Sequence, residues 1–180
     1  MYLLLLFLIK YIKFESNTFR TFIKNEDLNQ SQDPKERYSE PKFIGGGGFG
    51  NVYISKDNVS NKEVIIKRIE KVKVDQEKFN REIKAMINIK CENSVEYFNH
   101  YDDDEYYYIV MEKCDEDLEK FIQEKGAISE SMIKEILTQL NKAFKIMRSN
   151  GIIHRDLKPQ NILLNKLRKP ALIKKDLIEK

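Results

Sequence analysis

The sequence predicts an α+β fold with two lobes that meet near residues 112–115. Before this point, five stretches rich in β-branched and aromatic residues alternate with turn residues, and one stretch has the apolar spacing of a helix. After it, apolar residues recur mainly at helical spacing. Strands gathered in one part of a chain and helices in the other are typical of the α+β class.

The first lobe begins with a predicted hairpin around four consecutive glycines, Gly45–Gly48. A helix is expected over residues 76–89, and the acidic turn 102–105 separates the last two strands, which we expect to pair antiparallel. The five predicted strands cover residues 42–44, 49–55, 62–70, 95–101 and 106–112.

The second lobe is predicted to contain a short helix around Leu118–Ile122 and then a long one. Ser129 is the expected N-cap of the long helix, because a serine oxygen can accept a hydrogen bond from a backbone N–H of the first turn. Apolar residues continue on one face until Asn150 and Gly151, a pair typical of a helix end. This lobe is therefore mainly helical.

The N-terminal segment, residues 1–41, precedes both lobes, which we assign to residues 42–112 and 113–180. Residues 2–9 form an apolar run that is too short to cross a membrane, which takes about 20 residues. A weak membrane contact through residues 2–12, an incidental extension and, as a minority alternative, a cleaved signal all remain open. Residues 15–41 are polar and are interpreted as a linker.

The composition, with 41% apolar and 34% charged residues, is that of a globular chain with a real core. The net charge of +3 is too small to indicate nucleic acid or an acidic membrane as the main partner. Cys91 and Cys114 have no metal-binding spacing. A reduced, cytoplasmic location is therefore expected.

A glycine motif lies at the start of the first lobe. Gly45, Gly47 and Gly50 have the spacing GxGxxG, and Val52 follows in the order GxGxxGxV. Glycines let backbone N–H groups approach phosphate oxygens, but they also occur in turns that bind nothing. A dinucleotide-binding loop would lead from a strand into a helix, whereas residues 51–54 continue as a strand. The pattern therefore disfavours a dinucleotide-binding fold.

The most specific stretch is Ile153–Leu164, which reads IHRDLKPQNILL. Together with the glycine motif and Val64–Lys67, it resembles the eukaryotic-type protein kinases, in which motifs of this kind follow one another in this order. The segment Leu157–Pro159 resembles the serine/threonine subgroup. The resemblance covers about residues 42–165. It implies a two-lobed kinase-like fold with a five-stranded antiparallel upper lobe and an incomplete helical lower lobe.

The resemblance implies an enzyme that transfers the γ-phosphate of MgATP to serine or threonine of a protein substrate, with ATP and Mg²⁺ as cofactors. Asp156 would accept the proton of the substrate hydroxyl or orient that hydroxyl, and Lys158 would stabilise charge on the γ-phosphate. Asn161 would bind Mg²⁺ through its amide oxygen. His154 and Arg155 would support these residues.

The resemblance also implies a set of nucleotide contacts. Lys67 would neutralise the α- and β-phosphates and be held by Glu82, with Glu77 as the alternative. Ile65 stands where the family usually has alanine against adenine, so it would crowd the ring unless the pocket has shifted. The other implied contacts are the three motif glycines with Val52 and Leu163, Met111 as gatekeeper, the main chain of Glu112 and Cys114, and Asp117 at the ribose.

The sequence departs from the family pattern after Leu164. A DFG motif is expected soon after Asn161, and Asp176 is a poor substitute because it lacks the phenylalanine and glycine. The sequence therefore predicts a kinase domain truncated after its catalytic loop, with turnover in doubt. The alternative is an inactive or pseudokinase-like module that binds nucleotide and whose unfinished lower lobe a protein partner covers. A fragment of a longer gene product is the third reading.

Overall fold

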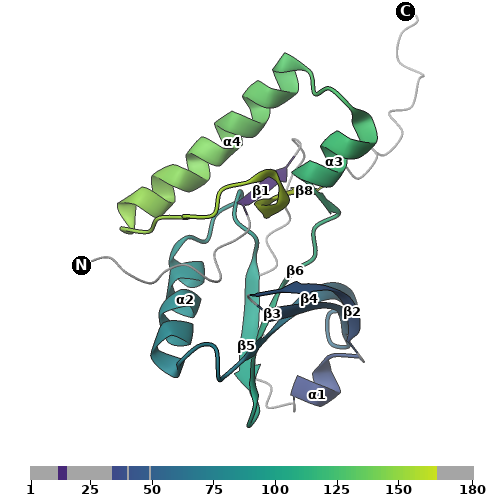
Figure 1. Cartoon of the computed structure of the whole chain (residues 1–180), viewed down its shortest axis with the longest axis vertical. Helices are drawn as coiled ribbons and strands as arrows, with labels where there is room; N and C mark the ends of the chain where they lie inside the picture. Colours follow the sequence, from purple (N-terminus) through teal and green to yellow (C-terminus); the bar gives the residue numbers. More distant parts are fainter. Residues whose placement is uncertain (1–11, 16–33, 40, 49, 166–180) are drawn as a thin grey trace, which may run out of the picture.

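The computed structural model describes residues 12–15, 34–39, 41–48 and 50–165. Its sheet-rich part and its helical part lie at opposite ends of the view in Figure 1, with a small sheet between them. The predicted α+β arrangement with two lobes is confirmed.

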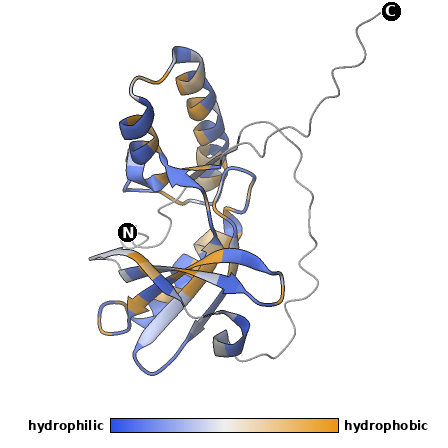
Figure 2. Cartoon of the chain, turned by 90° about the vertical axis from the view of Figure 1, so that its right-hand side faces the viewer, coloured by the Kyte–Doolittle hydropathy of each residue, from blue (hydrophilic) through white to orange (hydrophobic). Residues whose placement is uncertain are grey.

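The upper lobe is built on a five-stranded antiparallel sheet. The strand order β2-β3-β4-β6-β5 brings β4 to its centre, between β3 and β6. Figure 2 shows apolar (orange) and polar (blue) stretches next to one another in this sheet. The five strands are β2 (Lys42–Gly47), β3 (Gly50–Asp57), β4 (Lys62–Glu70), β5 (Tyr97–Asp102) and β6 (Tyr106–Glu112).

Helix α2 (Gln76–Asn88) covers one face of this sheet. Its N-cap is Asp75, whose carboxylate accepts a hydrogen bond from the backbone N–H of Lys78 at 2.8 Å. Phe79 of α2 is buried and stacks on Tyr107 of β6, with 4.2 Å between the ring centroids. The predicted helix is thus confirmed and forms the main core together with the inner face of the sheet.

The lower lobe consists of α3 (Leu118–Lys125) and α4 (Glu130–Ser149), followed by the short 3-10 helix η1 (Pro159–Asn161). The predicted N-cap Ser129 accepts a hydrogen bond from the N–H of Met132 at 3.3 Å. Gly151 follows α4 with a φ of +67°, a conformation that favours glycine at a helix end. The second core cluster, formed by residues of both helices and of β8, contains Leu118, Ile136, Leu140, Ala143, Ile162 and Leu164.

A second sheet joins segments that are far apart in the sequence. It has the order β1-β8-β7, where β1 is Ile12–Glu15, β7 is Glu116–Asp117 and β8 is Ile162–Asn165. The β1–β8 pair is parallel and the β7–β8 pair is antiparallel. The N-terminal segment therefore contributes a strand, a role that its own composition did not indicate.

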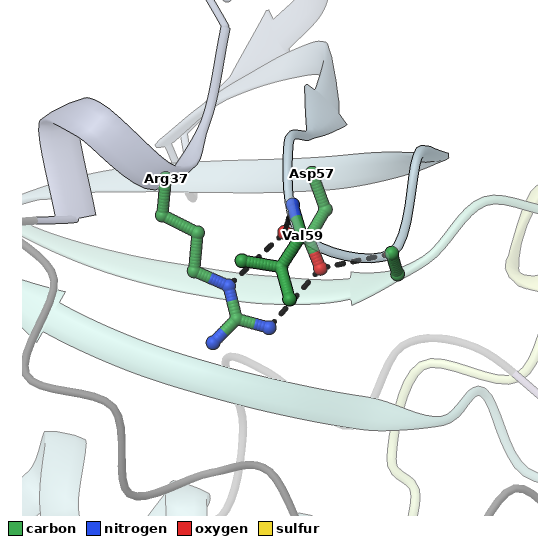
Figure 3. Close-up of polar contacts among 4 residues, drawn as sticks. Arg37, Asp57 and Val59 are labelled. Atoms are coloured by element: carbon green, nitrogen blue, oxygen red, sulfur yellow. Dashed lines mark hydrogen bonds and ion pairs between the residues drawn. The ribbon is translucent and has the colours of Figure 1, made fainter.

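The predicted linker is wrong over residues 34–39, which belong to the upper lobe. Helix α1 (Pro34–Arg37) ends at Arg37, whose Nε and Nη2 donate to the two carboxylate oxygens of Asp57 at 3.1 and 3.0 Å (Figure 3). Asp57 also accepts hydrogen bonds from the N–H of Val59 and the hydroxyl of Ser60. Tyr38 is buried beside this pair.

Within the described part of the chain, no helix is long and apolar enough to cross a membrane. Residues 2–11, on which the predicted membrane contact mainly depends, lie outside the described residues.

Candidate active site

The glycine motif lies where β2 turns into β3. Gly45 pairs with Val52, and Gly47 pairs with Gly50. Gly50 has a φ of +111°, and a Cβ atom there would lie 2.3 Å from the carbonyl oxygen of Arg68. A Cβ atom at Gly45 or Gly47 would meet nothing within 4 Å. The backbone geometry therefore requires glycine at Gly50, whereas the space at Gly45 and Gly47 is open for a ligand.

Lys67 and Glu82 are both buried, with 3% and 2% of their surface exposed. Lys67 is opposite Val52 of β3 and Ile109 of β6, so it lies on the same sheet face as the fully buried Ile109. Glu82 lies on the buried face of α2, which covers this side of the sheet. A lysine and a glutamate are rarely buried without a charged or polar partner.

The alternative helix glutamate, Glu77, is exposed and lies 3.8 Å from Arg81 in an i,i+4 ion pair on the surface of α2. The structure thus favours Glu82 over Glu77 as the glutamate of the predicted lysine site.

The residues predicted to surround adenine meet in one apolar cluster. Met111 is a buried member of the main core, and Ile65, Cys114 and Leu163 pack against that core from β4, the connection between lobes and β8. Ile65 is directly opposite Met111 in the β4–β6 ladder. The larger side chain at position 65 is therefore accommodated within the core packing of the sheet.

Glu112 and Asp117 have structural roles that the sequence did not reveal. Glu112 accepts hydrogen bonds from the N–H of Glu96 at 3.2 Å and from the side-chain amide of Asn165 at 3.3 Å. Asp117 is the N-cap of α3 and accepts a hydrogen bond from the N–H of Lys120 at 2.8 Å. Any ribose contact of Asp117 would have to use an oxygen that the cap leaves available.

The predicted catalytic residues converge on one carboxylate. The side-chain amide of Asn161 donates to Oδ2 of Asp156 at 2.9 Å and to the Asp156 carbonyl at 2.6 Å. Nζ of Lys158 lies 3.2 Å from Oδ1 of Asp156. Asp156 and Lys158 are partly or fully exposed, and Asn161 is buried. The loop thus presents a carboxylate, a cation and an amide together.

The backbone of this loop is held by the residues before Asp156. The N–H of Asp156 donates to the carbonyl of His154 at 2.9 Å and approaches its Nδ1 at 3.3 Å. His154 is buried, and Arg155 has a φ of +59°, which is uncommon for a residue with a side chain. The supporting role predicted for this pair therefore has a geometric basis: the tight turn fixes the backbone at Asp156.

Asn161 is a chemically suitable ligand for Mg²⁺. Its Nδ2 is directed to Asp156, so its Oδ1 points the other way and is a hard oxygen of the kind that Mg²⁺ prefers. Such sites in proteins often use one or two oxygen ligands and complete the shell with phosphate and water. Asp176, the predicted substitute for the missing metal ligand, lies outside the described residues.

Comparison with known proteins identifies the family. A family model described as "Protein kinase domain" matches residues 38–174. This chain belongs to the protein kinase family. The predicted family and the kinase-like fold are therefore confirmed.

Three curated kinases illustrate this relationship. Calcium-dependent protein kinase 6 of Plasmodium berghei (strain Anka) is 37% identical over 68% of this chain and 8% of its own length. The probable serine/threonine-protein kinase fhkB of Dictyostelium discoideum is 32% identical over 86% of the chain and 14% of its own. The probable serine/threonine-protein kinase zyg-1 of Caenorhabditis elegans is 36% identical over 75% of this chain and 19% of its own length.

A solved structure agrees with these relatives. Rad53 residues 1–466 in complex with AMP-PNP matches with a TM-score of 0.67 and 34% identity, over 73% of this chain and 35% of that chain. The chain thus spans less than a fifth of the length of the curated relatives and about a third of the Rad53 structure.

Proposed function

We propose that this chain is the nucleotide-binding and catalytic-loop part of a serine/threonine protein kinase. It binds MgATP and transfers the γ-phosphoryl group to a serine or threonine hydroxyl of a protein. The observation that carries the proposal is the convergence of Lys158 and Asn161 on the Asp156 carboxylate, within 3.2 and 2.9 Å. Family membership and the AMP-PNP complex of Rad53, whose ligand is an ATP analogue, support it.

The geometry suits phosphoryl transfer, which needs alignment and charge neutralisation more than covalent help from the protein. Asp156 orients the attacking hydroxyl and receives its proton. Lys158 lies beside it and stabilises charge on the transferred group. Asn161 would hold Mg²⁺ through its amide oxygen, and the ion would neutralise charge on the phosphates.

Phosphoryl transfer is tested by replacing Asp156 with asparagine. The change keeps the shape of the side chain but removes the base, so the rate of transfer from radiolabelled ATP to a protein acceptor should fall about 10²–10⁴-fold. Asp104→Asn makes the same chemical change at an exposed position in the turn between β5 and β6 and should leave the rate unchanged. Equal rates for Asp156→Asn and the unaltered chain would refute the proposed chemistry.

Nucleotide binding is tested separately with Lys67→Ala. At a nucleotide concentration a hundredfold above Kd, binding stabilises the folded state by about 2.7 kcal/mol, which raises Tm by about 5–10 °C for a chain of this size. We expect MgAMP-PNP to produce this rise in the unaltered chain and in Lys62→Ala, an exposed lysine of the same strand, but not in Lys67→Ala. A rise of equal size in all three proteins contradicts the role of Lys67.

A second candidate function is a module that binds nucleotide without transferring phosphate. It is favoured by apolar side chains on the surface of α4, where Ile133 and Leu137 are 43% and 59% exposed. Such a surface suits a protein partner on the lower lobe. This candidate predicts a rise in Tm with MgAMP-PNP but no transfer that depends on Asp156.

The same proposal includes a cytoplasmic location and, through residues 2–12, a weak membrane contact. Neither Cys91 nor Cys114 forms a disulfide within the described part of the chain, which suits a reducing compartment. Sedimentation with anionic vesicles, compared between the unaltered chain and a chain with Leu4 and Leu6 replaced by serine, tests the membrane contact. Equal sedimentation of the two proteins would count against it.

A further inference from the structure

The small sheet carries one side of the candidate site. β8 lies in its centre and pairs with β1 on one edge and β7 on the other. It begins at Ile162, immediately after Asn161. Its second residue, Leu163, is opposite Asp117 of β7 and opposite Lys13 of β1. The predicted metal, adenine and ribose contacts of the lower lobe thus lie in this sheet or in the turn that enters it.

The two edges of β8 are held unequally. β7 contributes two residue pairs, supplemented by a hydrogen bond from the N–H of Asp115 to the carbonyl of Leu164 at 3.1 Å. The ladder with β1 runs along all four residues of β8, from Ile12 opposite Ile162 to Glu15 opposite Asn165. β1 is also in contact with α4. The longer ladder is therefore the one that the N-terminal segment supplies.

Removal of β1 would leave the backbone groups on that edge of β8 without strand partners. With β1 in place, Ile162 and Leu164 are buried, with 7% and 4% of their surface exposed. Buried backbone N–H and C=O groups that lose their partners destabilise the segment that carries them. The first residue affected is the neighbour of Asn161.

We propose that β1 is a positioning strand for the nucleotide site: by pairing with β8 of the same molecule, it fixes the backbone that follows Asn161, and its release weakens MgATP binding. The inference rests on the proposed function. β1 acts through β8 and does not itself touch nucleotide. The segment for which the sequence left a membrane contact, an incidental extension and a cleaved signal open thereby becomes part of the nucleotide-binding structure.

The pairing is tested by disulfide formation in a chain from which the native cysteines are removed by Cys91→Ser and Cys114→Ala. Cα partners on neighbouring strands lie about 4.8 Å apart, within the range that a disulfide spans. Glu15→Cys with Asn165→Cys is in register and should form an intramolecular disulfide. Lys13→Cys with Asn165→Cys is shifted by two residues, about 8 Å, and should not.

The positioning role is tested with the double variant Lys13→Pro/Phe14→Pro. Alternate N–H groups of an edge strand face its neighbour, so two consecutive prolines remove one that faces β8. We expect faster amide hydrogen exchange at residues 162–165 and about tenfold weaker binding of MgAMP-PNP. Asn17→Pro/Thr18→Pro, beyond the end of β1, is the matched control and should change neither.

Each outcome decides the proposal. Equal MgAMP-PNP affinity in the two proline variants overturns it, and so do disulfides that form equally in both cysteine pairs. Disulfide-linked dimers from the in-register pair would assign the strand to a second copy and overturn the intramolecular assignment. If the unaltered chain binds no MgAMP-PNP, the proposed function fails. Amide hydrogen exchange then still tests the support of β8 by β1, and an unchanged rate at residues 162–165 in Lys13→Pro/Phe14→Pro would refute it.

Discussion

Replacing Gly50 with alanine is expected to destabilise the upper lobe by about 2–4 kcal/mol. The φ of +111° at Gly50 costs about 1–3 kcal/mol for a residue with a side chain. The new Cβ would also lie 2.3 Å from the carbonyl oxygen of Arg68, an atom of the neighbouring strand β4. Moving two paired strands apart to relieve this contact costs about 1–3 kcal/mol. A single backbone shift at residue 50 would relieve part of the φ strain and part of the contact with Arg68, so the two costs do not simply add.

Urea denaturation followed by circular dichroism measures this loss. With an m-value of about 2 kcal/mol/M, the midpoint should fall by about 1–2 M. Gly47→Ala is the matched control because a Cβ there meets nothing within 4 Å and the φ of Gly47 is not positive. Its free energy of unfolding should stay within about 0.5 kcal/mol of that of the unaltered chain, so its midpoint should shift by less than about 0.3 M. Equal midpoints for the two variants would refute the steric argument. Weaker MgAMP-PNP binding by Gly47→Ala at an unchanged midpoint would show that the ligand needs this glycine.

Two further predictions concern polar contacts that join distant segments. Burial alone would raise the pKa of Asp57, but its hydrogen bonds, above all that from Arg37, outweigh burial and hold the pKa below its ordinary value of 3.8. The carboxylate therefore stabilises the fold above pH 3.8 and loses this effect as the pH falls through the folded pKa. Asp57→Asn should lower the free energy of unfolding by about 1.5–3 kcal/mol at pH 7 and by progressively less below pH 4, measured by urea denaturation. An equal loss at pH 7 and pH 3 would contradict this. Gln139 of α4 accepts a buried hydrogen bond from Asn93 at 2.9 Å. Gln139→Ala should therefore lower stability by about 1–3 kcal/mol in thermal unfolding, whereas the same change at the exposed Gln123 of α3 should have little effect.

Sequence predicted the elements whose signals are local. The strands at residues 62–70 and 106–112 have the predicted bounds because each is rich in β-branched or aromatic residues. Ser129 was found as an N-cap because the cap and the helix it starts are neighbours in the chain. Residues 12–15 were missed as a strand because their partner, β8, comes after residue 161 and nothing within the segment marks a parallel pair.

In the candidate site, too, the contacts between residues close in the sequence were predicted and those between distant segments were not. The contacts among Asp156, Lys158 and Asn161 join residues within one short loop, so a contiguous motif was enough to predict that they gather. The hydrogen bond from Asn165 to Glu112 joins two strands of different sheets and has no sequence signal. The family resemblance placed Asp117 at the ribose, but its role as the N-cap of α3 depends on the backbone that follows it.

The position of Lys67 depends on strand register as well as on its motif. Successive residues of a strand face opposite sides, so a slip of β4 by one residue would exchange Lys67 with Arg68. The guanidinium of Arg68 lies over two rings on the outer face of the sheet, at 5.1 Å from the centroid of Tyr53 and 4.5 Å from that of Tyr106. Each such contact stabilises the pair by about 0.5–1 kcal/mol, and a slipped register would lose both and turn Arg68, in place of Lys67, toward the core. Arg68 therefore helps to select the register in which Lys67 faces α2, although it takes no part in the proposed chemistry.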